Sequence, residues 1–213
     1  MKKFLVFLLM LTFITKVNAY ENEIFKIEIP EGYTEEKQNE SNNYRWTKNN
    51  EYISITVSDN TKLKYDISEY TEEDIKKQKE YLETGINKGL EKYNIKVTVS
   101  DIRRFNQDDI FYLEYDLFYP SEKVTGYNMY QKGRMYTTNN YITTIIYSSE
   151  KELKNNEEYK NVIESLKIND TKVSKPNTLL YIIITAVSGI VLIVVAIVFI
   201  KMKKKNKKET SKK

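Results

Sequence analysis

The residue types that could do chemistry are few in this chain, because it contains neither histidine nor cysteine. Their absence removes Ser-His-Asp and Cys-His catalysis, most zinc sites and haem ligation through either residue. The six glycines form no phosphate-binding loop. The acidic pair Asp108-Asp109 stands before a predicted strand, where adjacent acids are typical of a solvated turn. Only a Ser-Lys dyad or a carboxylate pair would leave room for catalysis, so we expect no enzyme and no cofactor.

A second group of oxygen-bearing side chains invites comparison with calcium sites, which need several hard oxygen ligands. Asp59-Asn60, Asp66 and Glu69 cluster in a polar loop, but their spacing does not match an EF-hand. Helix capping and solvation of the loop explain these side chains better. We therefore predict no metal site.

The richest candidate surface comes from two predicted strands, 110–119 and 127–137. In the first strand one set of alternating residues forms an apolar face that we expect in the core: Phe111, Leu113, Tyr115, Leu117 and Tyr119. The opposite face of the two strands carries the candidate partner-binding residues Tyr112, Glu114, Asp116, Tyr130, Lys132, Arg134 and Tyr136.

This face has two interpretations. If the hairpin pairs Tyr119 with Tyr127, Glu114 lies opposite Lys132 and the charges form a cross-strand ladder beneath a covering helix. Alternatively, the face is a partner surface, since tyrosine and arginine are the residues that interfaces favour. Both interpretations stay open from the sequence.

Several further elements must position this face. Residues 24–29 predict a strand that ends in a Pro-Glu-Gly-Tyr turn, and 44–47 with 52–57 predict a hairpin around Asn49-Asn50. Strands are also predicted over 95–105 and 141–147. Consecutive strands joined by short turns indicate an antiparallel sheet, and helices packed against it make the fold class α+β.

Two helices are expected to cover this sheet. Thr71 can cap the first helix, whose apolar face consists of Ile75, Leu82, Ile86, Leu90 and Tyr93. The second helix carries an apolar stripe at helical spacing, made of Tyr159, Val162, Ile163 and Leu166.

The order of these elements and two local patterns resemble the PsbP-like family. The opening pattern is FKIEIPEGY at residues 25–33, and the closing pattern is YKNVIESL at 159–166. The resemblance spans residues 24–168 and implies an α/β/α sandwich around an antiparallel sheet. That fold is shared by an extrinsic photosystem II subunit and a Ran-binding nuclear transport factor, and it serves mostly as an interaction module. Only structural positions match, so no binding residue is carried over from the family.

The ends of the chain predict its location. Residues 1–19 have a basic start, a short apolar run and small residues before a cut after Ala19, which is typical of a secretory signal peptide. Residues 179–200 are apolar and uncharged, and as a helix they would rise about 33 Å, enough to span a bilayer. The tail 201–213 holds eight lysines against one glutamate, which places it in the cytosol and near anionic lipid.

The remaining residues form the expected exterior part, a domain over 20–168 and a linker over 169–178. Residues 20–178 hold 23 Lys and Arg against 29 Asp and Glu, a net charge of −6, so the basic residues of the chain flank the membrane. The basic isoelectric point is therefore no sign of nucleic-acid binding.

We expect a bacterial single-pass protein of the cell surface that binds another envelope protein without catalysis. One alternative is a binder of a lipid or small hydrophobic ligand in a cleft between helix and sheet. Another is wall attachment, because Pro176 and Thr178 match a sortase signal, although Lys175 stands where leucine is usual.

Overall fold

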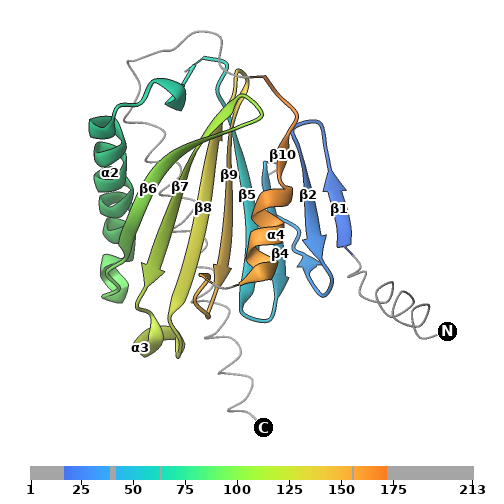
Figure 1. The fold of residues 1–213 in the computed structure, drawn as a ribbon. Coiled ribbons are helices and arrows are strands. Elements are labelled where there is room, and N and C mark those ends of the chain that lie inside the picture. The colour runs from blue at the N-terminus through green and yellow to red at the C-terminus, as the bar shows by residue number, and fades with distance from the viewer. Residues whose placement is uncertain (1–16, 39–41, 63, 155, 172–213) are drawn as a thin grey trace, which may run out of the picture.

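The computed structural model describes residues 17–38, 42–62, 64–154 and 156–171 (Figure 1). Most of the predicted signal peptide, the apolar segment 179–200, the tail 201–213 and the sortase-like motif lie outside the described residues. Within the described residues, no helix is long and apolar enough to cross a membrane.

The main layer is a seven-stranded sheet in the order β3-β4-β5-β9-β8-β7-β6, and each neighbouring pair is antiparallel. This confirms the predicted α+β class and antiparallel sheet. The strands are β3 (Thr34–Glu35), β4 (Asn43–Lys48), β5 (Glu51–Asp59), β6 (Thr98–Gln107), β7 (Ile110–Tyr119), β8 (Met129–Thr137) and β9 (Tyr141–Ser149).

One face of this sheet is covered by α2 (Glu72–Leu90), which lies beside β6 in Figure 1. Its start is fixed by a capping box in which Thr71 Oγ1 accepts from the Asp74 amide and Asp74 accepts from the Thr71 amide. The predicted apolar residues within α2, Ile75, Leu82, Ile86 and Leu90, are buried against the sheet together with Ile67 of the short 3₁₀ turn η2 (Ile67–Glu69). The predicted Tyr93 lies beyond α2, in the 3₁₀ turn η3 (Glu91–Tyr93), and packs half-buried against the same residues. The first hydrophobic core lies here.

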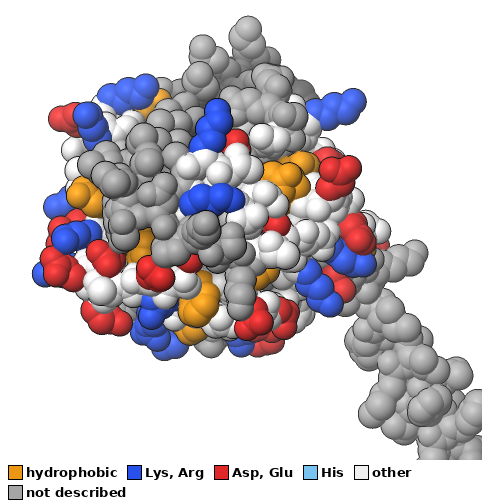
Figure 2. Space-filling view, turned by 90° about the horizontal axis from the view of Figure 1, so that it is seen from above, with side chains coloured by type: hydrophobic (Ala, Val, Ile, Leu, Met, Phe, Trp, Pro, Cys, Tyr) orange, Lys and Arg blue, Asp and Glu red, His pale blue; other side chains and the backbone are white. Residues whose placement is uncertain are grey.

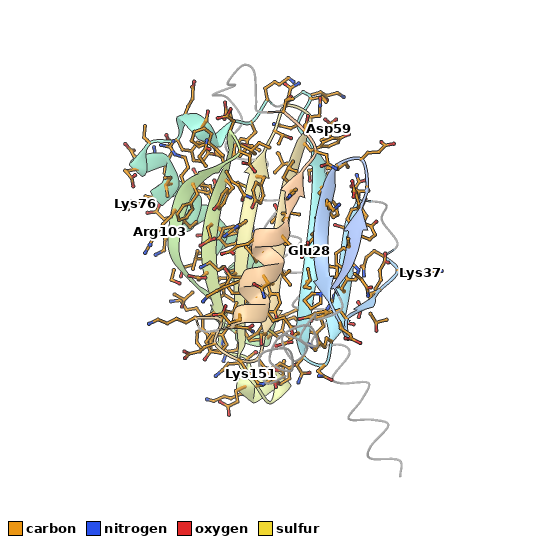
Figure 3. All side chains as sticks on the ribbon, turned by 45° about the vertical axis from the view of Figure 1, so that its right-hand side comes forward. Glu28, Lys37, Asp59, Lys76, Arg103 and Lys151 are labelled. Atoms are coloured by element: carbon orange, nitrogen blue, oxygen red, sulfur yellow. The ribbon has the colours of Figure 1, made fainter. Side chains whose placement is uncertain are left out.

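The opposite face is covered by α4 (Glu157–Ser165) and by a second, three-stranded sheet in the order β1-β2-β10. Its strands are β1 (Val17–Glu21), β2 (Phe25–Pro30) and β10 (Lys167–Ile168). The amide of Glu28, which lies beside α4 in Figure 3, donates to Ser165 Oγ at 3.0 Å and joins the two parts of this layer. The second core contains Phe25, Trp46 and the predicted stripe of α4.

Two of the turns between strands lie where the sequence predicts them. Asp108 and Asp109 both have positive φ, at 52° and 67°, and both side chains are exposed, which confirms the predicted solvated turn between β6 and β7. Asn49, with φ at 54°, makes the tight β4–β5 hairpin. β8 begins at Met129 rather than at Tyr127, because Tyr127 closes the connection that contains the short helix α3 (Glu122–Thr125) and the left-handed Gly126: its carbonyl accepts from Ser121 Oγ at 2.8 Å.

The last described residues, 169–171, are hydrogen-bonded to the rest of the domain. The amide of Asn169 donates to the Ile24 carbonyl at 2.8 Å, and the Thr171 carbonyl accepts from the Asn139 amide at 2.8 Å. Between them, Asp170 accepts from Thr138 Oγ1 at 2.6 Å. Of the first three residues of the expected linker, Asn169 is therefore held beside the start of β2, and Asp170 and Thr171 are held against the turn between β8 and β9.

Candidate functional site

The predicted surface on β7 and β8 exists, but its register differs from our prediction. Tyr119 pairs with Met129, not with Tyr127, so Glu114 lies opposite Arg134 and Asp116 opposite Lys132. The prediction was wrong by two residues because the β7–β8 connection contains α3 and Gly126. A shift of two residues keeps every side chain on its face, since side chains alternate along a strand.

The charges of this face form a ladder. Glu114 accepts from Arg134 Nε at 2.7 Å and from Lys132 Nζ at 3.0 Å, and Lys132 reaches Asp116 at 3.5 Å. The side chains of Arg134, Glu114 and Lys132 are only 11, 17 and 21% exposed, whereas that of Asp116 is 46% exposed. The ladder therefore has a half-buried centre at Glu114 and an open end at Asp116.

Two of the seven candidate residues lie in the core. Tyr112 and Tyr136 are 7 and 2% exposed, and their ring centroids lie 4.9 Å apart. The Arg134 guanidinium lies 4.8 Å from the centroid of the Tyr112 ring. Burial raises the pKa of Tyr136 to about 12, so its hydroxyl stays neutral. These two tyrosines pack in the core beside the ladder, where a partner would not contact them.

The other five candidates, Glu114, Asp116, Tyr130, Lys132 and Arg134, line a hollow beside α4 of about 740 Å³. Helix α4 forms one wall: Lys132 Nζ lies 5.7 Å from the centroid of the Tyr159 ring, and Arg134 Nη1 donates to the Ile163 carbonyl at 3.4 Å. Burial lowers the pKa of Lys132, but its hydrogen bond to Glu114 and the electrostatic effects of Tyr159, Glu114 and Asp116 together outweigh burial and raise the pKa overall. The ladder thus lies under the edge of α4, as the covering-helix interpretation expected.

Sequence reasoning missed the rest of the lining. Phe118 and Tyr130 face each other across β7 and β8 with ring centroids 5.1 Å apart, and they form a half-buried aromatic shelf. The rim adds Glu152 and Lys154 from the β9–α4 connection and Lys160 and Glu164 from α4. Phe118 follows Asp116 in the alternation of β7 and could have been included. The rim residues could not, because only the packing of α4 brings them to this strand pair.

The other predicted oxygen clusters have structural roles. Asp66 accepts from the Ser68 amide and caps η2, and Asp59 accepts from the Thr61 amide at 2.7 Å. Asn60 is fully buried and its amide group donates to the carbonyls of Tyr65 and Thr138. Within the described ranges, no group of three or more acidic side chains could hold a metal ion.

Comparisons with known proteins agree on the fold alone. No protein-family model matches the chain, and no curated protein matches it either. Among solved structures, the chain is similar to the cyanobacterial PsbP (CyanoP) from Synechocystis sp. PCC 6803, with a TM-score of 0.52 and 12% identity over 73% of this chain and 94% of that chain. The predicted PsbP-like α+β fold is therefore confirmed.

A second similar structure is the Ran-binding protein Mog1p of Saccharomyces cerevisiae, with a TM-score of 0.44 and 8% identity over 73% of this chain and 97% of that chain. Identities this low carry no binding residue from either protein to this chain.

Proposed function

We propose that this chain is a single-pass, membrane-anchored exterior module that binds another cell-envelope protein, with the hollow beside α4 as its docking surface. The observation that carries the proposal is the convergence of the half-buried ladder centred on Glu114, the aromatic shelf and the rim of α4 on one concavity. Aromatic and arginine side chains are enriched at the centres of protein interfaces.

The anchoring part of the proposal is supported by the sequence. The apolar, uncharged segment 179–200 is followed at once by Lys201 and a lysine-rich tail, which favours a cytosolic C-terminus near anionic lipid. The N-terminal segment 1–19 has the pattern of an export signal. Wall attachment through Pro176 and Thr178 is the alternative, and the intact mass of the mature protein separates the two because a sortase would remove the tail.

A lipid or small hydrophobic ligand fits the hollow less well. Eight of its lining side chains carry charge, whereas sites for apolar ligands are lined mainly by hydrophobic side chains. Catalysis is not part of the proposal, because the ladder carboxylate Glu114 is engaged by two cations rather than poised as a base.

Site-specific photocrosslinking in native membranes tests the docking surface. The crosslinker p-benzoylphenylalanine replaces Tyr130 in the hollow or, as the control, Tyr81, which is 45% exposed on α2. We expect one dominant protein adduct from position 130 and none of that mass from position 81. Equal adducts from both positions, or no adduct from position 130, would overturn the proposal.

A further inference from the structure

The face of the sheet on the side of α2, opposite to α4, carries polar side chains in its middle (Figure 1). Along β5, Ile53, Ile55 and Val57 enter the second core, whereas Ser54 and Thr56 alternate with them and lie on the α2 side. Such alternation is typical of an antiparallel strand with one apolar face and one polar face. The polar face therefore needs hydrogen-bond partners.

Five neighbouring uncharged side chains of this face each hold a polar atom without a hydrogen-bond partner among the described residues. These atoms, which we call the polar patch, are Ser54 Oγ on β5, Ser148 Oγ on β9, Gln131 Oε1 on β8 and the hydroxyls of Tyr115 and Tyr119 on β7. None of the five side chains is more than 6% exposed. Because buried polar groups are nearly always hydrogen-bonded, the polar patch points to a bound polar molecule.

The strand register brings the polar patch together in two adjacent rows. Ser148 pairs directly with Gln131, and Ser54 lies in the next row with Gly133, one strand removed from it. The Tyr115 ring lies over Gly133, since a Cβ at that position would be 2.7 Å from the Tyr115 hydroxyl. With strands about 4.8 Å apart and alternate residues about 7 Å apart, the rows cover about 10 by 7 Å, a footprint that a disaccharide can fill.

The hydrogen-bonding capacity of the patch is mixed. Burial raises the pKa of Tyr115 and Tyr119, and in Tyr119 the nearby Tyr115 adds to the effect, so both hydroxyls stay neutral and can donate. The Gln131 oxygen only accepts, and the serine hydroxyls do both. A ligand must therefore offer donors and acceptors together, as adjacent hydroxyl groups do.

The charge at the edge of the patch is already paired. Arg45, which lies opposite Ser54, has its Nε 3.4 Å from the Glu36 carboxylate and its guanidinium 4.6 Å from the centroid of the Tyr52 ring. An ionic ligand would lose its hydration without a counter-charge in the patch. A wholly apolar ligand would leave the hydroxyls without partners. A neutral ligand with several hydroxyls avoids both costs.

We infer that the polar patch binds a neutral saccharide, whose hydroxyls bond to Ser54, Ser148 and Gln131 and whose ring packs on Tyr115. Tyrosine rings suit this role because they combine an apolar face with a polar tip. The saccharide would enter from the β4 side, where Thr47, in the row of Ser148, is half-buried rather than buried. This site goes beyond the proposed docking surface, which lies on the other face of the sheet.

Saturation-transfer NMR on the full-length chain in nanodiscs tests the inference with maltose and cellobiose as neutral disaccharides, glucuronate as an anionic sugar and octanol as an apolar probe. We expect a neutral disaccharide to bind and the other two probes not to. Tyr115→Phe and Ser148→Ala should each weaken binding about tenfold, the effect of one lost hydrogen bond. The matched control Tyr81→Phe removes the same hydroxyl from an exposed position on α2 and should leave binding unchanged.

The melting temperature without sugar provides a second readout. Tyr115→Phe should not lower it, because the hydroxyl has no protein partner to lose. If this variant melts earlier and binds the sugar as before, ordered water holds the hydroxyl and the inference fails. It also fails if neither disaccharide binds, if glucuronate or octanol binds as tightly, or if Tyr81→Phe weakens binding as much as Tyr115→Phe. The docking surface is tested separately by the adducts from position 130, so neither result decides the other.

Discussion

The ladder predicts that two carboxylates on the same strand, those of Glu114 and Asp116, contribute very different amounts to the free energy of unfolding. Glu114 and Asp116 lie two residues apart on β7 and face the same way, but the Glu114 side chain is 17% exposed and the Asp116 side chain 46%. Glu114→Gln removes the carboxylate from two close cations, Arg134 at 2.7 Å and Lys132 at 3.0 Å. Asp116→Asn removes the same charge from a longer contact with Lys132, at 3.5 Å, on a more exposed side chain.

The expected magnitudes follow from this burial. Removing one partner of a fully buried ion pair costs about 3–5 kcal/mol, whereas an exposed pair contributes about 0–1 kcal/mol. Glu114 lies nearer the buried case, but its remaining exposure and the amide left by glutamine reduce the loss, so we expect about 2–3 kcal/mol of unfolding free energy. For Asp116→Asn we expect about 0.5 kcal/mol or less.

Urea unfolding of the full-length chain in detergent measures both values. The fluorescence of Trp46, the single tryptophan, reports on the second core, which also contains the α4 residues above the ladder. The m-value should stay unchanged, because neither substitution alters the surface exposed on unfolding. If the two variants differ by less than about 0.5 kcal/mol, the burial argument for the ladder is refuted.

Three further predictions use the same unfolding measurement. Burial raises the pKa of Asp170, but hydrogen bonds led by that from Thr138 outweigh it and lower the pKa; the stabilisation is therefore present above the unfolded pKa of about 3.9 and is lost as the pH falls through the folded pKa. Asp170→Asn should cost about 1–2 kcal/mol at neutral pH and much less at acid pH, and an equal loss at both would contradict this. Thr71→Ala should cost about 1 kcal/mol through the capping box, whereas Thr71→Ser should cost less. Gly133→Ala should cost about 1–3 kcal/mol, because its Cβ would lie 2.5 Å from the Tyr115 ring, and the cost should shrink in a Tyr115→Leu background.

The sequence predicted on which face of a strand each side chain lies better than it predicted the register between neighbouring strands. Alternation along β7 correctly assigned Leu113 and Tyr115 to the core and Glu114 to the opposite face, since alternation depends only on the strand itself. The register required knowledge of the β7–β8 connection, and α3 there is too short to recognise from its four residues. The prediction therefore placed the wrong cation opposite Glu114, but it assigned the correct residues to this face of the sheet.

Exposure was the harder quantity to predict. Tyr112 and Tyr136 stand on the same face as the ladder, but the second core extends beneath them and buries both. Nothing in β7 or β8 signals this, because the covering atoms belong to other parts of the chain. The small sheet was missed for a related reason: β10 has two residues, and β1 begins within the stretch that we assigned to the signal peptide.

The path of the chain decides how the docking surface would face a membrane. Asn60 donates its amide proton to the Asn140 carbonyl and Asn139 to the Thr171 carbonyl, so the described chain ends at the end of the sheet that Asp59 marks in Figure 3. The hollow lies toward the other end, which Lys151 marks, at the start of β8 and beyond the end of β9.

Under the proposed anchoring, residues 172–178 are the tether, and they reach at most about 25–30 Å when fully extended. The end seen in Figure 2, where the coloured side chains are an intermixed set of basic, acidic and hydrophobic ones, would then lie nearest the lipid. Such a surface suits water and headgroups rather than insertion. The hollow is lined by β8 from Arg134 to Tyr130, so it would begin roughly 10 Å and end roughly 23 Å from the Thr137 end of that strand, at about 3.3 Å per residue. A partner must therefore reach the hollow above the membrane surface, which favours a protein with an exterior domain of its own over one confined to the bilayer.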